Sequence, residues 1–168
     1  MVQLISPSTP EPFHQKPLDV DYNSPTELFK FLEAKKWNMV KERVEECPHE
    51  AASWITRRGK DGSIRWKILP LHAALCTKAP KDTLIYVVQA CAKAFSLADD
   101  QGGLPMCLAF QDEHIGEEVI KIMFQSNPPG INAKDKEGKV IMGHPILLVL
   151  KFWQEMEVEK VRLEEKER

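Results

Sequence analysis

Two short segments of this chain repeat one pattern, and this repeat constrains the fold more than any other feature. Residues 69–75 are Leu-Pro-Leu-His-Ala-Ala-Leu, and residues 104–110, about 35 positions later, are Leu-Pro-Met-Cys-Leu-Ala-Phe. A period of roughly 20–50 residues is typical of stacked repeat units. Such units contact only their neighbours and form an extended surface that commonly binds other molecules. The repeat therefore favours a binding protein over an enzyme.

Apolar residues at helical spacing extend the repeat to three successive helical hairpins. The first helices of these hairpins share an apolar face, and their second helices align in columns. Residues 99–102 and 135–138 share an Asp-x-x-Gly turn between hairpins. The agreement of several columns predicts that the hairpins stack on one another. The aligned columns are Val40, Leu84 and Val119; Val44, Val88 and Met123; and Cys47, Cys91 and Ser126.

The composition changes at both ends of the repeat region. Residues 1–23 contain several prolines and few apolar residues, which predicts a disordered tail. Residues 154–168 are mostly charged, which predicts the exposed end of a capping helix. A short coiled coil there is an alternative, but its apolar run is shorter than the roughly 3–4 heptads required. The repeat domain then covers residues 24–153, with units at 24–68, 69–103 and 104–139 and a partial unit at 140–153.

Local signals predict where the helices begin. Residues 24–27, Ser-Pro-Thr-Glu, are typical of a capping box, with Ser24 as the N-cap and the proline at the first helical position. Asn38 is expected to cap the next helix. Pro70 and Pro105 are expected at first helical positions, because a proline there removes no hydrogen bond.

These motifs resemble the ankyrin repeat, which opens with Thr-Pro-Leu-His-x-Ala and has a period of about 33 residues. Residues 69–74 match that opening with Leu for Thr, and residues 104–109 match it with Leu for Thr and Cys for His. The resemblance covers about residues 24–150. It implies an all-α, ankyrin-like helical-hairpin solenoid of about three repeats with a C-terminal capping helix. It also implies a non-enzymatic scaffold that binds a protein partner through its concave face and inter-repeat loops.

Residues that could carry chemistry have simpler explanations within this frame. The four cysteines lack the close pairs of zinc sites, so we expect reduced thiols, with Cys47 and Cys91 packed in the core. Asp99 is expected to bond nearby amides in a turn rather than to act as an acid. His72 is expected to hydrogen-bond the backbone of its own turn or the adjacent one. We therefore expect no enzyme activity, cofactor, metal site or small-molecule substrate.

The stretch from Arg57 to Lys67 is the feature that the repeat explains least. It has a local charge of +4, with five basic residues against Asp61 alone, and it contains Trp66. Such a stretch suits an acidic protein or, as the alternative function, a nucleic acid or phosphoinositide. A competing interpretation folds Trp66 over the second hairpin and leaves the charges merely solvated. The candidate partner-binding residues are Arg57, Arg58, Arg65, Trp66, Gln101, His114 and Lys136.

The overall charge and hydropathy set the remaining expectations. The formal net charge is −2, which gives no general attraction to nucleic acid or to an anionic membrane. The chain has no apolar run of about 18 residues and no secretory signal pattern at its start. We therefore expect an intracellular monomer, cytoplasmic or nuclear, whose main partner is a protein.

Overall fold

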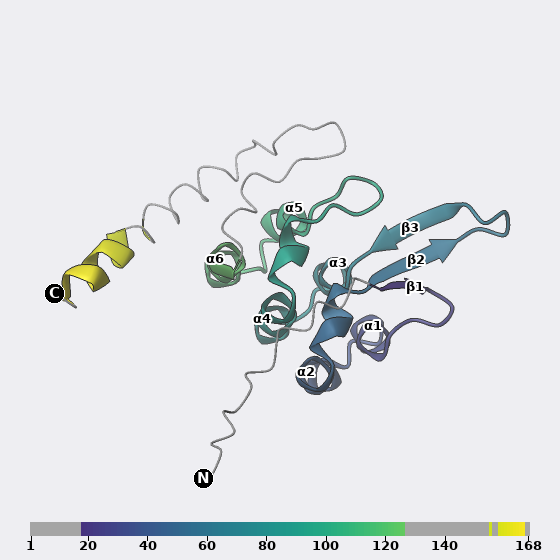
Figure 1. Ribbon diagram of the computed structural model, residues 1–168, viewed down its shortest axis with the longest axis horizontal. Coiled ribbons are helices and arrows are strands. Elements are labelled where there is room, and N and C mark those ends of the chain that lie inside the picture. Colours follow the sequence, from purple (N-terminus) through teal and green to yellow (C-terminus); the bar gives the residue numbers. More distant parts are fainter. Residues whose placement is uncertain (1–17, 127–154, 156–157, 167–168) are drawn as a thin grey trace, which may run out of the picture.

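Three helical hairpins stack side by side in this protein. The computed structural model describes residues 18–126, 155 and 158–166, and the fold is given for these. The first helices pack against one another in one row and the second helices in another, and Figure 1 shows both rows end-on. The first row holds α1 (Glu27–Glu33), α3 (Pro70–Cys76) and α5 (Pro105–Gln111), and the second row holds α2 (Trp37–Glu46), α4 (Lys81–Ala90) and α6 (Glu117–Ser126).

A three-stranded mixed sheet accompanies the helices, so the predicted all-α solenoid is wrong. The strand β1 (Asp19–Asp21) pairs in parallel with β2 (Trp54–Arg58), and β2 pairs antiparallel with β3 (Ile64–Ile68). Both β2 and β3 contain the β-branched and aromatic residues that favour strands. Because β1 has only three residues and its partner lies far along the chain, its pairing leaves little local signal. The strand β1 thus lies inside the segment that we expected to be a tail.

Both prolines of the repeat motif begin helices, as predicted. Pro70 is the first residue of α3 and Pro105 is the first residue of α5. The turn after Asp99 also forms as expected, since the Asp99 carboxylate accepts the backbone N–H groups of Gln101 at 2.9 Å and Gly103 at 2.7 Å. These features depend on interactions within a few residues, which explains why the sequence pattern predicts them.

The first hairpin departs from the predicted caps. The N-cap of α1 is Thr26, whose Oγ1 accepts the backbone N–H of Phe29 at 3.3 Å. The predicted cap, Ser24, belongs instead to the turn that leaves β1. The helix therefore begins two residues later than the capping box predicts. The next helix, α2, begins at Trp37, one residue before Asn38, without a side-chain cap.

Two of the three predicted columns are buried in the core. The third is only partly buried, because Cys47 and Cys91 lie just after α2 and α4 and each precedes a 3-10 turn. The expectation of two core cysteines therefore needs correction. The 3-10 turns are η1 (Pro48–Ala52) and η2 (Ala92–Ser96). The buried members of the other columns are Val40, Leu84, Val119, Val44, Val88 and Met123.

His72 connects the second hairpin to the turn that follows it. Its Nδ1 accepts the backbone N–H of Leu69 at 3.2 Å, and its Nε2 donates to the carbonyl of Gly103 at 3.1 Å. The ring is therefore neutral, with its proton on Nε2. Burial lowers the pKa of His72, and the hydrogen bond to Gly103 offsets only part of this effect. His72 thus bonds both its own turn and the adjacent one. The matching residue of the third hairpin, Cys107, has no ring nitrogens with which to make these two bonds.

The C-terminal residues in the described part, 158–166, are helical and exposed. Three of them are apolar and stay in solvent: Val158, Val161 and Leu163. The predicted partial unit at 140–153 lies outside the described residues, as does Lys136. None of the described helices is both long enough and apolar enough to cross a membrane.

Candidate functional site

The β2–β3 hairpin extends away from the two rows of helices (Figure 1). Its tip is closed by a hydrogen bond from the backbone N–H of Gly59 to the carbonyl of Ser63 at 2.8 Å. Gly62 adopts a φ of 81°, a conformation that favours glycine, and the Asp61 carboxylate accepts the backbone N–H and hydroxyl of Ser63. The turn at Asp61 and Gly62 therefore lies at the tip of a strand hairpin.

The basic residues of this hairpin divide between the two faces of the sheet, because side chains alternate along a strand. Arg57 lies over the ring of Tyr22, 5.0 Å from its centroid. The adjacent Arg58 lies on the other side, where its charge helps to lower the pKa of Asp19. The register shifts between these two arginines and leaves Arg65 as an extra residue on β3. The stretch with a local charge of +4 therefore does not form one continuous basic surface.

On the second face of the sheet, Asp19 neutralises the charge of Lys67. The Nζ of Lys67 lies 2.8 Å from Oδ2 of Asp19 and rests over the ring of Trp54. The hydroxyl of Thr56 donates to the same carboxylate at 2.5 Å. The hydrogen bond from Lys67 and then that from Thr56 lower the pKa of Asp19. On the edge of β3, the backbone N–H of Lys67 also donates to the Asp100 carboxylate at 2.7 Å. Lys67 is thus a structural residue.

The other face carries a group of aromatic rings beneath Arg57. The rings of Tyr22 and Trp66 meet edge to face, with their centroids 4.9 Å apart. Trp66 lies 6.5 Å from Phe29 of α1, and Tyr22 lies 6.2 Å from the same ring. We call Tyr22, Arg57 and Trp66 the aromatic platform. Trp66 therefore packs over the first hairpin, whereas the competing interpretation placed it over the second.

The remaining predicted residues are spread over separate parts of the surface. Gln101 is exposed in the turn beside β3, where its side-chain amide donates to Asp100 at 2.8 Å. Arg65 is exposed near the hairpin tip. His114 is exposed in the loop between α5 and α6 and lines a pocket to which no residue of the sheet contributes. Of the predicted residues that the structure describes, only Arg57 and Trp66 lie together in the platform.

Tyr22 belongs to the platform, but the sequence-based selection missed it. It lies in the segment predicted to be a disordered tail. Residues 19–22 do alternate between polar and apolar types, which is a weak strand signal. The Tyr22 hydroxyl donates to the Glu33 carboxylate at 3.1 Å, and this hydrogen bond raises the pKa of Tyr22. The contact fixes the ring against α1.

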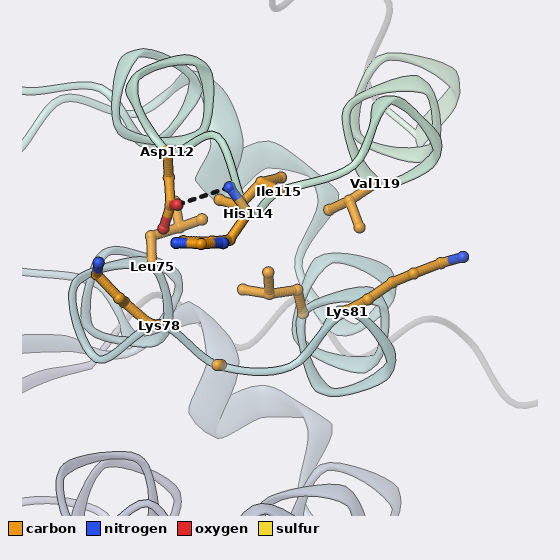
Figure 2. A pocket seen from close by; sticks show the side chains of 9 residues that line it. Leu75, Lys78, Lys81, Asp112, His114, Ile115 and Val119 are labelled. Atoms are coloured by element: carbon orange, nitrogen blue, oxygen red, sulfur yellow. Dashed lines mark hydrogen bonds between the residues drawn. The ribbon is translucent and has the colours of Figure 1, made fainter.

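A small open pocket lies between the second and third hairpins (Figure 2). Leu75 and Val119 contribute apolar walls, and His114 lies at the rim. The backbone N–H of His114 donates to Asp112 at 2.9 Å, while Lys81 at the rim forms an ion pair with Glu118. The side chains of Lys78, Asp112 and His114 lie at one end of the pocket (Figure 2), whereas the side chain of Lys81 is engaged by Glu118.

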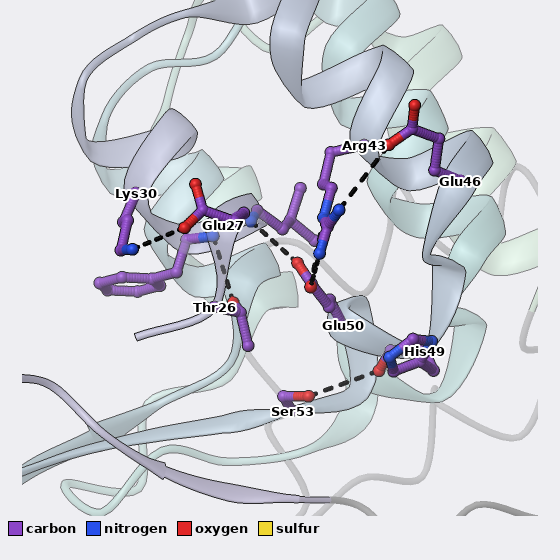
Figure 3. A network of polar contacts seen from close by, with 10 residues as sticks. Thr26, Glu27, Lys30, Arg43, Glu46, His49, Glu50 and Ser53 are labelled. Atoms are coloured by element: carbon purple, nitrogen blue, oxygen red, sulfur yellow. Dashed lines mark hydrogen bonds and ion pairs between the residues drawn. The ribbon is translucent and has the colours of Figure 1, made fainter. Parts of the chain in front are cut away.

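A buried polar network joins the elements of the first hairpin (Figure 3). Glu50 in η1 is 7% exposed; its Oε1 lies 2.5 Å from Nη2 of Arg43, and its Oε2 accepts the backbone N–H of Leu28 at 2.9 Å. Burial alone raises the pKa of Glu50, but the bonds from Arg43 and Leu28 lower it more, so the net shift is downward. This carboxylate has a structural role, and the sequence-based selection did not include it.

Two observations concern possible metal ligands and nucleophiles among the described residues. Among them, no group of three His, Cys, Asp or Glu side chains could hold a metal ion. Burial raises the pKa of the thiols of Cys76, Cys91 and Cys107, which disfavours the nucleophilic thiolate. The aromatic platform and the hairpin tip are therefore the strongest candidates for a functional surface.

Comparison with known proteins finds no match for this chain. No protein-family model matches it, and neither does any curated protein or solved structure that was searched. The ankyrin resemblance therefore stays a hypothesis that rests on the motif residues themselves.

Proposed function

We propose that this protein is a non-enzymatic, ankyrin-like interaction module that binds a protein partner through the aromatic platform and the adjoining hairpin tip. One observation carries the proposal: Tyr22, Arg57 and Trp66 lie together on one face of the sheet. Tyrosine, arginine and tryptophan are the residue types most enriched at binding hot spots. Their convergence from β2, β3 and the end of β1 is what a partner-binding surface requires.

The attachment of the platform to the helices supports the same function. Trp66 rests against Phe29, which is 1% exposed, and Tyr22 is held by Glu33. On the opposite side of the hairpin, the edge of β3 is held by Asp100 of the next turn. A surface fixed in this way loses little conformational entropy when a partner binds.

Affinity purification with charge-reversal variants tests the proposal. Full-length protein carrying Arg57→Glu, Arg58→Glu and Arg65→Glu should lose the partner that the wild type recovers from its source cell, as quantified by mass spectrometry. Circular dichroism should show unchanged helix content, because all three side chains are exposed. Lys41→Glu is the matched control, since Lys41 also rests over a tyrosine ring, that of Tyr86. Equal recovery by wild type and variant contradicts the proposal, as does collapse of the fold.

A second candidate function is the binding of an anionic polymer or lipid at the hairpin tip. Within residues 18–126, Arg58, Lys60 and Arg65 form no ion pair with an acidic side chain, and this observation favours it. The commitment of Lys67 to Asp19 weighs against it. Binding of this kind falls steeply as salt increases, so a titration of a DNA oligonucleotide at several salt concentrations tests it.

A further inference from the structure

We infer that the aromatic platform recognises an acidic peptide segment of its partner, with Arg57 receiving a carboxylate of that segment. This inference rests on the proposed function and adds the chemical class of the partner. It goes beyond a general basic patch, because it assigns the recognition to one side chain that is held in place by its neighbours.

Arg57 is positioned to bind a carboxylate. Its guanidinium lies 5.0 Å over the Tyr22 ring, a contact that restrains the side chain, and the residue as a whole is exposed. In the part of the chain that the structure describes, no acidic side chain pairs with it. The nearby Glu33 accepts the hydroxyl of Tyr22. A carboxylate from a partner would supply the missing paired acceptor.

Trp66 gives this position an apolar border. It is half-buried and opposite Arg57 in the strand register, so the two side chains share one face. An ion pair beside an indole ring is partly shielded from water, which strengthens the attraction. The exposed charges of Arg58, Lys60 and Arg65 near the tip attract an acidic segment over a longer range.

The distribution of charge favours an acidic peptide over a phosphate backbone. A nucleic acid presents a regular row of phosphates, which a row of cations on one surface would neutralise. Here Arg57 and Arg58 lie on opposite faces, and Asp19 lies beside Lys67 on the second face. A peptide with one acidic anchor needs only the single position that Arg57 provides.

Selection from a random peptide display library on the full-length protein tests the inference. Peptides selected on the wild type should be enriched in Asp and Glu relative to the input library. The enrichment should vanish on Arg57→Ala and persist on Lys41→Ala, the matched loss of a cation over a tyrosine ring. Thermal unfolding of each variant checks that the fold is retained.

Titration of one selected peptide then separates specific recognition from general attraction. Its affinity should fall about tenfold for Arg57→Lys, because lysine keeps the charge but lacks the paired donors. Replacing the acidic residues of the peptide with Gln or Asn should cause a similar loss. An unchanged affinity for Arg57→Lys overturns the inference.

The possible failures can be told apart. Selected peptides that are no richer in acidic residues leave the proposed function intact and overturn the inference. Failure of the wild type to select any peptide above background, together with equal recovery in the affinity purification, overturns both. Tighter binding of a DNA oligonucleotide or of phosphatidylserine vesicles than of the selected peptide overturns the inference in favour of the second candidate function.

Discussion

The first and second helical hairpins have the same order of elements, but different polar side chains connect those elements. In both, a residue with a left-handed φ joins the two helices, Lys35 at 54° and Lys78 at 57°, and a 3-10 turn follows the second helix. The first hairpin contains the charged pair of Glu50 and Arg43, whereas the second uses the neutral His72. The apolar columns thus define the stacking, while each unit is free to use its own polar contacts.

Equivalent positions show how this freedom is used. The third residue of η1 is Glu50, and the third residue of η2 is Ala94, which has no side-chain acceptor. The third residue of α3 is His72, and the third residue of α1 is Phe29. Phe29 cannot bond a neighbouring turn, but it supports Tyr22 and Trp66. At this position the first unit therefore has a phenylalanine that supports the proposed binding surface, where the second unit has a histidine that bonds two turns.

The charged contact of the first hairpin should produce the largest effect when it is removed. Glu50→Ala leaves the buried N–H of Leu28 without an acceptor and Arg43 without its partner. We expect a loss of about 2–3 kcal/mol in the free energy of unfolding, measured by urea denaturation. Glu46→Ala is the control, because Glu46 is exposed and its closest oxygen lies 3.7 Å from Arg43. Equal effects of the two substitutions would contradict the assignment.

The neutral contact of the second hairpin should have a somewhat smaller effect. His72→Phe introduces the side chain that the first hairpin has at this position and leaves the N–H of Leu69 and the carbonyl of Gly103 unpaired. We expect a loss of about 2 kcal/mol in the free energy of unfolding. The exposed His114→Phe should leave stability nearly unchanged. A variant as stable as the wild type would mean that His72 does not hold the two units together.

The helix caps should show the next effect. Thr26→Ala removes the acceptor for the N–H of Phe29 and should cost about 1 kcal/mol. Ser24→Ala should change the free energy of unfolding by less than about 0.5 kcal/mol, because Ser24 does not cap α1. A larger loss of stability for Ser24→Ala than for Thr26→Ala would support the predicted capping box instead.

The pH dependence of the free energy of unfolding should distinguish the two hairpins. These effects should be the smallest of the series, because protonation leaves both side chains in place. The pKa of His72 is lowered from 6.5, so the unfolded chain takes up this proton first, and stability falls as pH drops below about 6.5. The pKa of Glu50 is lowered from 4.5, so its contribution is lost only as pH drops below about 4.5. Urea denaturation between pH 8 and 3 should show the first loss missing in His72→Phe and the second missing in Glu50→Gln. Coincident losses in all three proteins would contradict the comparison.

Local sequence patterns predicted much of the helical frame. The helix starts at Pro70 and Pro105 follow from the fixed backbone angle of proline, and the turn at Asp99 follows from bonds to nearby amides. The buried columns follow from helical periodicity.

The candidate site was predicted only in part. Arg57 and Trp66 were selected because basic and aromatic residues occur together, but their neighbour Tyr22 was assigned to a tail. The sequence also suggested one continuous charged stretch, whereas strand alternation divides it between two faces. Glu50 had no local motif, since its acceptor role depends on Leu28 and Arg43 in two other helices.

The amino-acid sequence by itself determined the repeat, the helix starts at the two prolines and the apolar columns, because these depend on spacings within a few turns of helix. Only the tertiary structure decided the parallel pairing of β1 with β2. It also decided that Arg57 lies with Tyr22 and Trp66, while Lys67 lies with Asp19. Asp19 and Tyr22 are distant in sequence from these partners, and they reach them because β1 pairs with β2. No local pattern in either segment indicates this pairing.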